Sequence, residues 1–495
     1  MRKRARMRKH TVITGLTALS LGAAVVSASS ASAATHSVRL SVIGRDGTVR
    51  SAGATLVSLA GQHGRTLMSG KAVAVPDGRY AITSFVHDNG AVTLIARTVQ
   101  VTKDMTITLD ARAGAPASFG VDDPAATLSA LEVVPFIGDR ATGHERAVIT
   151  DADRSLDPAD ALYVVPAPND TALRLGVHAV LSNPAATPIP TRYDLVRSYS
   201  GLPAQVSLHN TAAQLARVDM SFSAPDSEAT RGLQLSARYA DLAPVVDADG
   251  LQPAEDLTDR LVSYRSPGLQ WVSAVYLTSG AGGATMTEHG NPGGLLAAGA
   301  TYAERWGAGL WGISPGFRIK TGAGRPRVTG EGPICPPAGK GVNLTSCQSL
   351  DTQVTSHVSK TSGWYTATLT AVRDAEADTT TRVLGRWRVP AKNNAELGSF
   401  RLFMSGLDTS HLAPVGSIGT LDVSVAGLRS VKTLTVETST DDGQTWHRAV
   451  VLGSGSHWTA ALINPGAGAV SVRVKATSTT GSSAQETILR AWGTH

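Results

Sequence analysis

Short stretches in which apolar and polar residues alternate run through almost the whole chain of 495 residues. In a β-strand successive side chains point to opposite faces, so a period of two turns one face toward a core and the other toward solvent. Five of the clearest stretches are residues 37–43, 105–109, 233–239, 364–370 and 470–474. Long apolar patterns of period 3.6 are missing, so the sequence predicts an all-β protein.

The strands are expected to form several antiparallel β-sandwich domains in series. Four regions can be separated after the N-terminal segment: residues 34–117, 118–312, 313–411 and 412–495. The first ends in the linker Ala113-Gly-Ala-Pro-Ala117, and the last is rich in short strand patterns. All eight tryptophans lie in the second half of the chain, which predicts larger cores there.

Residues 1–33 have the three parts of a secretory signal peptide. Six basic residues precede the apolar stretch 11–26, and the small residues Ala31-Ser32-Ala33 fit cleavage after Ala33. The apolar stretch is shorter than the ~20 residues that span a membrane comfortably, although an uncleaved anchor is the alternative. No twin-arginine pair is present. We therefore expect a Sec-type signal peptide and a secreted, extracellular protein with no membrane attachment after cleavage.

The charge balance excludes some classes of partner. The chain has 45 Lys and Arg against 39 Asp and Glu. Because six of the basic residues and none of the acidic ones lie in residues 1–33, the rest of the chain carries 39 of each. A general nucleic-acid binder or a polybasic membrane-surface protein needs an excess of positive charge. The sequence therefore predicts neither.

Cys335 and Cys347 are the two cysteines of the chain, and they enclose an irregular Pro- and Gly-containing segment. In an oxidising compartment two cysteines this close most simply form a disulfide, which would stabilise the fold by roughly 3 kcal/mol. The alternative is a metal site, which would need further ligands, and the segment has no CxxC or suitably spaced histidine. We expect a structural disulfide.

The segment Ser439-Thr-Asp441-Asp-Gly443-Gln-Thr445-Trp446 resembles the Asp-box of sialidases and other secreted β proteins. Asp441 can accept hydrogen bonds from turn amides, Gly443 supplies a positive φ, and Trp446 can pack under the hairpin. The box occurs once here. We interpret it as a structural hairpin tip, with sugar binding as the alternative.

The segment Val75-Pro-Asp-Gly-Arg-Tyr80 has a turn in which Pro presets φ and Tyr80 begins the next strand, facing the core. It resembles the Pro-x-Gly-x-Tyr signature of transthyretin-like, carboxypeptidase-regulatory-type β-sandwiches. The resemblance covers residues 34–117 and implies a structural or adhesive module without a catalytic role.

Three further parts of the chain resemble the non-catalytic C-terminal accessory β-domains of secreted subtilisin-like serine peptidases of actinobacteria. They are residues 101–112, the landmarks Tyr193–Val196 with Tyr302–Trp306, and the final stretch 457–492. The resemblance implies that residues 412–495 form an Ig-like β-sandwich. The Asp, His-Gly-Thr-His and Gly-Thr-Ser motifs that a subtilisin-like active site needs are all missing.

Two motifs elsewhere match functional patterns only in part. Gly312-Ile-Ser314-Pro-Gly316 has the spacing of a serine nucleophile elbow, but Pro315 has no N–H for an oxyanion hole. Residues 151–162 begin like a calcium loop, but Leu156 and Leu162 occupy the positions that require Gly and Glu. We interpret the first as a turn and the second as a solvated polar loop, with a calcium site as the alternative.

Together these features predict a secreted, non-enzymatic multidomain β protein that binds or organises an extracellular protein or a cell-wall polymer. No catalytic residue, cofactor or metal ligand is assigned from the sequence. The rival hypothesis is a secreted hydrolase of another type, acting on glycans with two facing carboxylates or working within a serine-protease system. The third hypothesis is a passive, wall-exposed spacer with no specific ligand.

Overall fold

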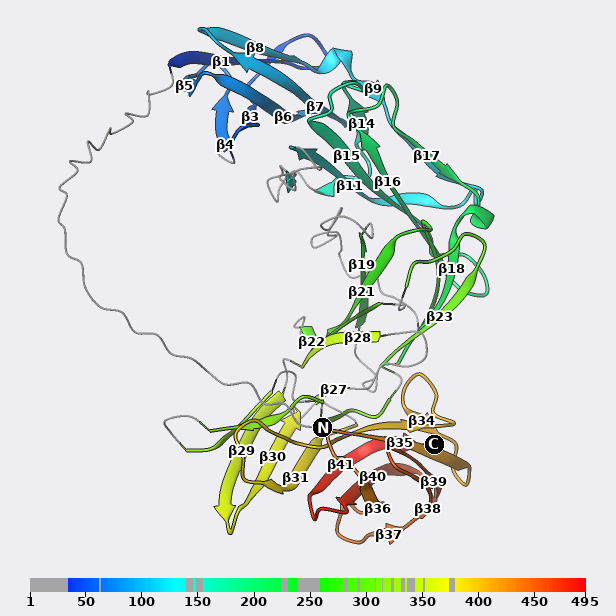
Figure 1. Cartoon of the computed structure of the whole chain (residues 1–495). Helices are drawn as coiled ribbons and strands as arrows, with labels where there is room; N and C mark the ends of the chain where they lie inside the picture. Colours follow the sequence, from blue (N-terminus) through cyan, green and yellow to red (C-terminus); the bar gives the residue numbers. More distant parts are fainter. Residues whose placement is uncertain are drawn as a thin grey trace, which may run out of the picture.

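The computed structural model describes residues 34–61, 64–138, 146–147, 155–223, 230–238, 259–278, 284–291, 294–307, 309–313, 315–321, 325–330, 334–335, 343–349, 352–373 and 379–495. These residues form β-strands and two 3-10 turns, η1 (Ala111–Ala113) and η3 (Ala212–Gln214), and contain no α-helix. The all-β prediction is confirmed. In Figure 1 the elements follow one another in chain order, from blue to red.

The segment predicted to be a signal peptide, residues 1–33, lies outside the described residues. Cleavage after Ala33 and secretion therefore remain predictions. No helix in the described part of the chain has the length and apolar character that a membrane span requires.

The first region consists of two sheets with one core between them. In the first sheet β2 and β5 flank β1, and β8 also pairs with β1; the strands are β1 (Thr35–Ile43), β2 (Val49–Arg50), β5 (Ala72–Pro76) and β8 (Met105–Asp110). The second sheet has the order β4 (Gly64–Met68), β3 (Gly53–Ser58), β6 (Gly78–Asp88), β7 (Ala91–Val101), β14 (Ala161–Val164) and β9 (Ala115–Pro116). Inward residues of both sheets, such as Leu40 and Leu56, fill the core. Tyr80 is buried there, and its hydroxyl donates to the Pro76 carbonyl at 2.9 Å.

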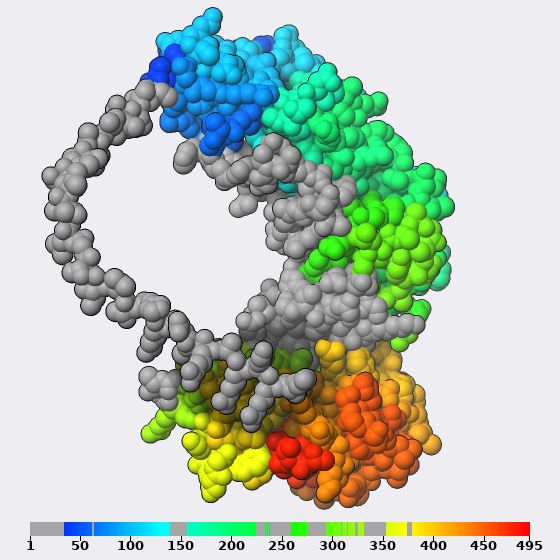
Figure 2. Space-filling view, in the orientation of Figure 1, coloured from blue at the N-terminus to red at the C-terminus, as the bar shows by residue number. Residues whose placement is uncertain are grey.

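The first region continues into the second without a break in the packing. β14, from beyond the linker, pairs in parallel with β7. Val57, Ala81 and Leu94 of the first region share a core with Leu131 and Val177 of the second. The space-filling view in Figure 2 shows one continuous surface from blue to green.

An eight-stranded central sheet organises the second region. Its order is β12 (Arg146–Ala147), β11 (Thr127–Ile137), β15 (Leu173–Asn183), β16 (Thr191–Ser200), β20 (Arg260–Arg265), β18 (Ala216–Phe222) and β23 (Thr301–Trp306), with β13 (Ser155–Leu156) also paired to β11. Beside it lie a two-stranded sheet of β10 (Ser118–Val121) and β17 (Ser207–Asn210), and a four-stranded sheet of β19 (Thr230–Arg238), β21 (Gln270–Thr278), β22 (Ala284–Asn291) and β28 (Asn343–Ser349).

Both faces of the central sheet are covered around β15, whereas Arg217 and Asp219 of β18 are exposed on one face. Leu131, Val177 and Leu195 on one face belong to the core shared with the first region. Met220 on the other face packs with Trp271 of the four-stranded sheet. As a result β15 is buried along its whole length, including its polar side chains.

The face toward Trp271 carries a buried group of charged residues. Arg192 donates to the Asp194 carboxylate through Nε and Nη2, at 3.0 and 2.9 Å. His178 Nε2 lies 3.0 Å from the same carboxylate, and its ring meets Trp271 edge-on at 6.0 Å. Burial raises the pKa of Asp194, but the charge of Arg192 and the hydrogen bond from His178 outweigh it and hold the pKa below its ordinary value.

A second buried ion pair lies farther along the same face. The Arg265 guanidinium meets Glu304 through two parallel bonds of 2.8 and 3.1 Å, and both side chains are almost completely buried. The Ser273 hydroxyl and the Trp306 indole N–H also donate to Glu304, at 3.3 and 3.2 Å. Buried charges need such full pairing, because each unpaired one costs several kcal/mol.

The terminal region consists of two facing sheets. The large terminal sheet has the order β29 (Thr352–Thr361), β30 (Trp364–Arg373), β31 (Arg382–Pro390), β41 (Ser483–Thr494), β40 (Gly468–Ser478), β36 (Val431–Ser439) and β37 (His447–Arg448), with β34 (Leu412–Ala413) also paired to β41. The small terminal sheet has the order β33 (Ser399–Met404), β35 (Ile418–Ala426), β39 (His457–Ile463) and β38 (Val450–Ser454).

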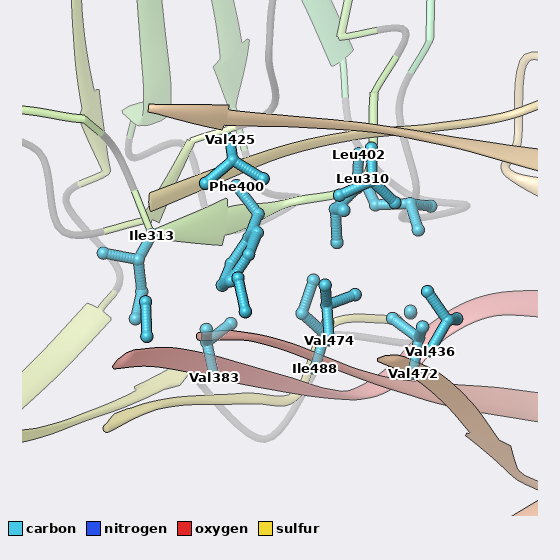
Figure 3. Close-up of a cluster of buried hydrophobic side chains, with 14 of the residues drawn as sticks. Leu310, Ile313, Val383, Phe400, Leu402, Val425, Val436, Val472, Val474 and Ile488 are labelled. Atoms are coloured by element: carbon cyan, nitrogen blue, oxygen red, sulfur yellow. The ribbon is translucent and has the colours of Figure 1, made fainter. Parts of the chain in front are cut away.

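Apolar side chains of the two terminal sheets fill one core, shown in Figure 3. Val383 and Ile488 of the large terminal sheet face Phe400 of the small one (Figure 3). Trp311 and Ile313 from the preceding segment belong to the same core. The predicted regions 313–411 and 412–495 therefore share one core, and they also share one sheet because β31 pairs with β41. We call this unit the terminal module.

Short strands close one side of the terminal module. β24 (Gly312–Ile313) pairs with β27 (Ile334–Cys335), and β25 (Arg318–Lys320) pairs with β26 (Arg327–Thr329) and β32 (Ala395–Glu396). β24 is bound to the large terminal sheet by a buried acid: the Ile313 N–H donates to the Glu486 carboxyl at 2.8 Å. Burial raises the pKa of Glu486 to about 8, against an ordinary value of 4.5, and the bond from Ile313 lowers it only in part.

Most strand pairs are antiparallel, as predicted, but six pairs in the described residues are parallel. They are β1–β8, β10–β17, β14–β7, β16–β20, β18–β23 and β34–β41. The prediction of purely antiparallel sheets is therefore wrong. Alternation along a strand shows which side chains share a face, and it contains no information on the direction of the neighbouring strand.

Glu304→Gln tests the buried ion pair. The variant leaves the charge of Arg265 buried without a counter-charge, so we expect the free energy of unfolding to fall by about 3–5 kcal/mol. Asp219→Asn is the control, because Asp219 pairs with Arg217 at the surface, where loss of the pair costs less than about 1 kcal/mol. Urea unfolding followed by tryptophan fluorescence measures both, and equal effects would contradict the assignment.

Glu486→Gln tests the buried acid. The folded chain keeps the proton that the unfolded chain releases, so the contribution of Glu486 to stability is complete below pH 4.5 and is lost as the pH rises to about 8. The variant stays neutral, so we expect it to lack this loss. Urea unfolding midpoints of the wild type and the variant, measured from about pH 5 to about pH 9, test this expectation. Glu396→Gln, at an exposed carboxyl of β32, should behave as the wild type does.

Candidate binding face of the terminal module

The outer face of the large terminal sheet presents a regular array of polar side chains. Residues paired across neighbouring strands point to the same side of a sheet. One row across six strands consists of His357, Thr368, Arg386, Gln485, Lys475 and Thr435. The adjacent row consists of Ser359, Thr366, Arg388, Ser483, Thr477 and Thr433. We call these two rows the outer face.

The outer face has an excess of positive charge. Arg386 and Arg388 on β31 and Lys475 on β40 are exposed. The described residues of β29, β30, β31, β41, β40 and β36 include two acids, Glu437 and Glu486. Glu486 points into the core, and Glu437 accepts from Arg473 Nε at 2.6 Å. On the same side of the sheet Glu437 lies one row beyond Lys475, opposite its partner Arg473, so the two rows of the outer face contain three cations and no carboxylate.

Two tryptophans at the border of this face are each covered by an arginine. The Arg388 guanidinium lies 3.6 Å from the ring centroid of Trp364, and its Nη1 donates to the Gly481 carbonyl at 3.0 Å. The Arg473 guanidinium lies 4.2 Å from the ring centroid of Trp446. Such contacts hold the guanidinium plane in a fixed orientation.

The residues of the sequence-predicted Asp-box come together beside Arg473. The Asp441 carboxylate accepts from the Ser439 hydroxyl at 2.6 Å, from the Gln444 N–H at 3.0 Å and from the Thr445 N–H and hydroxyl at 2.9 and 2.5 Å. The hydroxyls of Ser439 and Thr445 and the turn amides hold the pKa of Asp441 well below its usual range. All four contacts lie within the turn, which is the geometry of a hairpin tip.

Gly443 and Trp446 complete the hairpin. Gly443 has φ of +85°, donates its N–H to the Ser439 hydroxyl at 2.8 Å and accepts the Trp446 indole N–H at 2.9 Å. Asp442 forms an ion pair of 2.9 Å with Arg490 of β41. The hairpin is therefore fastened to the large terminal sheet at both Arg473 and Arg490.

The predicted disulfide falls on residues whose side chains lie outside the described part of the chain. The backbone places Cys335 in β27 and Cys347 in β28, and these two strands are in contact. The bond itself remains a prediction. Ser314 and residues 151–154 of the other two motifs also lie outside the described residues. No group of three or more His, Cys, Asp or Glu in the described part could hold a metal ion.

The other outer face of the terminal module, on the small terminal sheet, carries exposed aliphatic side chains beside polar ones such as Asp422 and Thr459. Four aliphatic side chains are 65–76% exposed there: Ile418, Val450, Leu452 and Ile463. Ile418 and Ile463 are direct partners across β35 and β39. One module thus presents two faces of different chemistry.

The cations of the outer face are not among the functional residues predicted from the sequence. A signal for them exists in the segment Arg382-Val-Leu-Gly-Arg386-Trp-Arg388-Val389, where arginines alternate with buried Val383, Trp387 and Val389. This alternation places the arginines on one exposed face of a strand. Which other cations share that face depends on strand order, which the segment does not contain.

Comparison with known proteins does not identify a family for this chain. Neither a protein-family model nor a curated protein matches the chain. A solved structure of a Ca2+-stabilised adhesin that helps an Antarctic bacterium reach out and bind ice aligns over 90% of each chain, at 10% identity and a TM-score of 0.15. A TM-score this low places no constraint on the fold or the function of this chain.

Asp441→Asn tests the hairpin. The amide nitrogen cannot accept the bond that the carboxylate takes from the Thr445 hydroxyl, so we expect faster hydrogen exchange at the amides of Gln444 and Thr445 and a lower melting temperature. Asp442→Asn is the matched control, because it removes a carboxylate from the same turn but breaks only the surface pair with Arg490. Equal exchange rates in the two variants would contradict a structural Asp-box.

Proposed function

We propose that this chain is a secreted, non-catalytic, multidomain β protein that binds a component of the cell envelope through the outer face. The observation that supports this is the array itself. Six neighbouring strands present hydroxyl, amide and cationic side chains in register, and two of the arginines in and beside it are held by aromatic rings. Ordered donors on rigid strands suit binding, because little side-chain freedom is lost on contact.

The proposal also includes the type of β-sandwich that each region forms. Residues 34–117 correspond to a transthyretin-like β-sandwich and the terminal module to an Ig-like one. The chain would then be related to the accessory domains of actinobacterial subtilisin-like peptidases, standing without the catalytic domain. Sheets that face each other across one core in both places support this assignment.

The buried acids do not favour the hydrolase alternative. Glycoside hydrolysis needs two carboxylates beside a substrate in a cleft. Asp194 and Glu304 are bound to Arg192 and Arg265, and both carboxylates are buried. Glu486 has the raised pKa of a general acid, but it faces the hydrophobic core, where no substrate reaches it.

Cosedimentation with washed cell envelopes tests the proposal. We expect the secreted chain to sediment with the envelopes and Thr368→Trp to bind weakly, because its indole would cover the part of the outer face beside Arg386 without changing any charge. Thr420→Trp is the matched control, because Thr420 lies on the outward side of the small terminal sheet. No binding by the wild type, or equal binding by the two variants, would overturn the proposal.

A further inference from the structure

We infer that the outer face binds a linear polymer of phosphodiester-linked polyols. This inference rests on the proposed function and names its partner. Arg386 and Arg388 are two residues apart on one strand, which separates their Cα atoms by about 7 Å. Lys475 lies two strands from Arg386 in the same row, at about 10 Å. Three cations therefore lie within reach of successive charges of one chain.

The groups between the cations are hydrogen-bonding groups without charge. Gln485 lies between Arg386 and Lys475 in one row, and Ser483 lies beside Arg388 in the other. Hydroxyl and amide groups pair with the hydroxyls of a polyol, whereas the cations pair with its anions. The face thus alternates charge and hydrogen bonding as such a polymer does.

Guanidinium groups favour phosphate as the anion. The planar fork of an arginine offers two parallel N–H donors to the two free oxygens of a phosphodiester. Arg388 is already oriented by Trp364 and the Gly481 carbonyl, so binding would not have to immobilise it.

The face is a poorer match for single-stranded nucleic acid. Its bases bind by stacking on exposed aromatic rings. Trp364 and Trp446, the tryptophans at the border of the face, each have an arginine over the ring. What remains available is positive charge and hydroxyl groups, so we commit to the polyol phosphate and treat nucleic acid as an outcome of the test.

Binding of the full chain to a glycerol-phosphate polymer fixed on beads tests the inference. Replacing the three cations together, as Arg386→Gln, Arg388→Gln and Lys475→Gln, should weaken binding about tenfold or more, and added salt should weaken wild-type binding. The matched control is Arg39→Gln, Lys71→Gln and Arg79→Gln, exposed residues of the first region with the same total charge. We expect the control to bind as the wild type does.

A second variant keeps Arg388 and its stacking on Trp364, so that a folding defect cannot imitate the result. Arg386→Gln with Lys475→Gln should still bind several-fold more weakly than the wild type, with an unchanged melting temperature. The inference is overturned by equal losses in the face and control variants, or by no binding of the wild type at low salt. It is also overturned by tighter binding of single-stranded DNA or of polyglutamate with the same number of charges.

The two proposals can fail separately. Envelope binding that is lost in Thr368→Trp but unaffected by removal of the three cations leaves the outer face as a binding surface and overturns the polyol phosphate as its partner. Polymer binding by the wild type that depends on the three cations, without any binding to envelopes, supports the chemistry of the face and overturns its envelope role.

Discussion

Burial of alternate apolar side chains between facing sheets is the interaction on which this structure depends. Each strand has two faces. Where a sheet is covered on one side, only the side chains of the covered face are buried in the core. In the terminal module the inward residues of both sheets fill one core, and Trp311 and Ile313 complete it from outside the facing strands. The outward residues have no part in that packing, so their chemistry is free to serve binding.

In the central sheet of the second region the same packing has a different result, because both faces are covered around β15. The polar residues that alternate along β15 would be solvent-exposed in a sheet covered on one side. Here they are buried, so they must find partners inside the protein: His178 meets Asp194, and Arg174 donates to Ser198 at 2.7 Å while lying over the ring of Phe136. The covering sheet turns an ordinary strand pattern into a network of buried hydrogen bonds and ion pairs.

These two cases show what could be predicted from the sequence. Apolar residues alternate with other residues along β15 and along the strand at Arg382–Pro390, which is the pattern of a β-strand in both cases. It could not predict that one is covered on both faces and the other on one, since burial depends on sheets formed by distant segments. For the same reason the boundary drawn at residue 411 crosses a continuous sheet: β31 and β41 are far apart in sequence and adjacent in space.

The candidate site also has one part that could be predicted from the sequence and one part that could not. The Asp-box could be located from its sequence because its contacts span only a few residues, from Ser439 to Trp446. The outer face could not, because the row that joins Arg386 to Lys475 passes through β41, and its register is set by pairing with both neighbours. Residues 34–495 carry no net charge, and they can still present a cationic face: sheet pairing gathers positive charge from separate strands while the matching acids lie elsewhere. Net charge excludes a uniformly basic protein, but it does not exclude a local anion-binding surface built on one sheet.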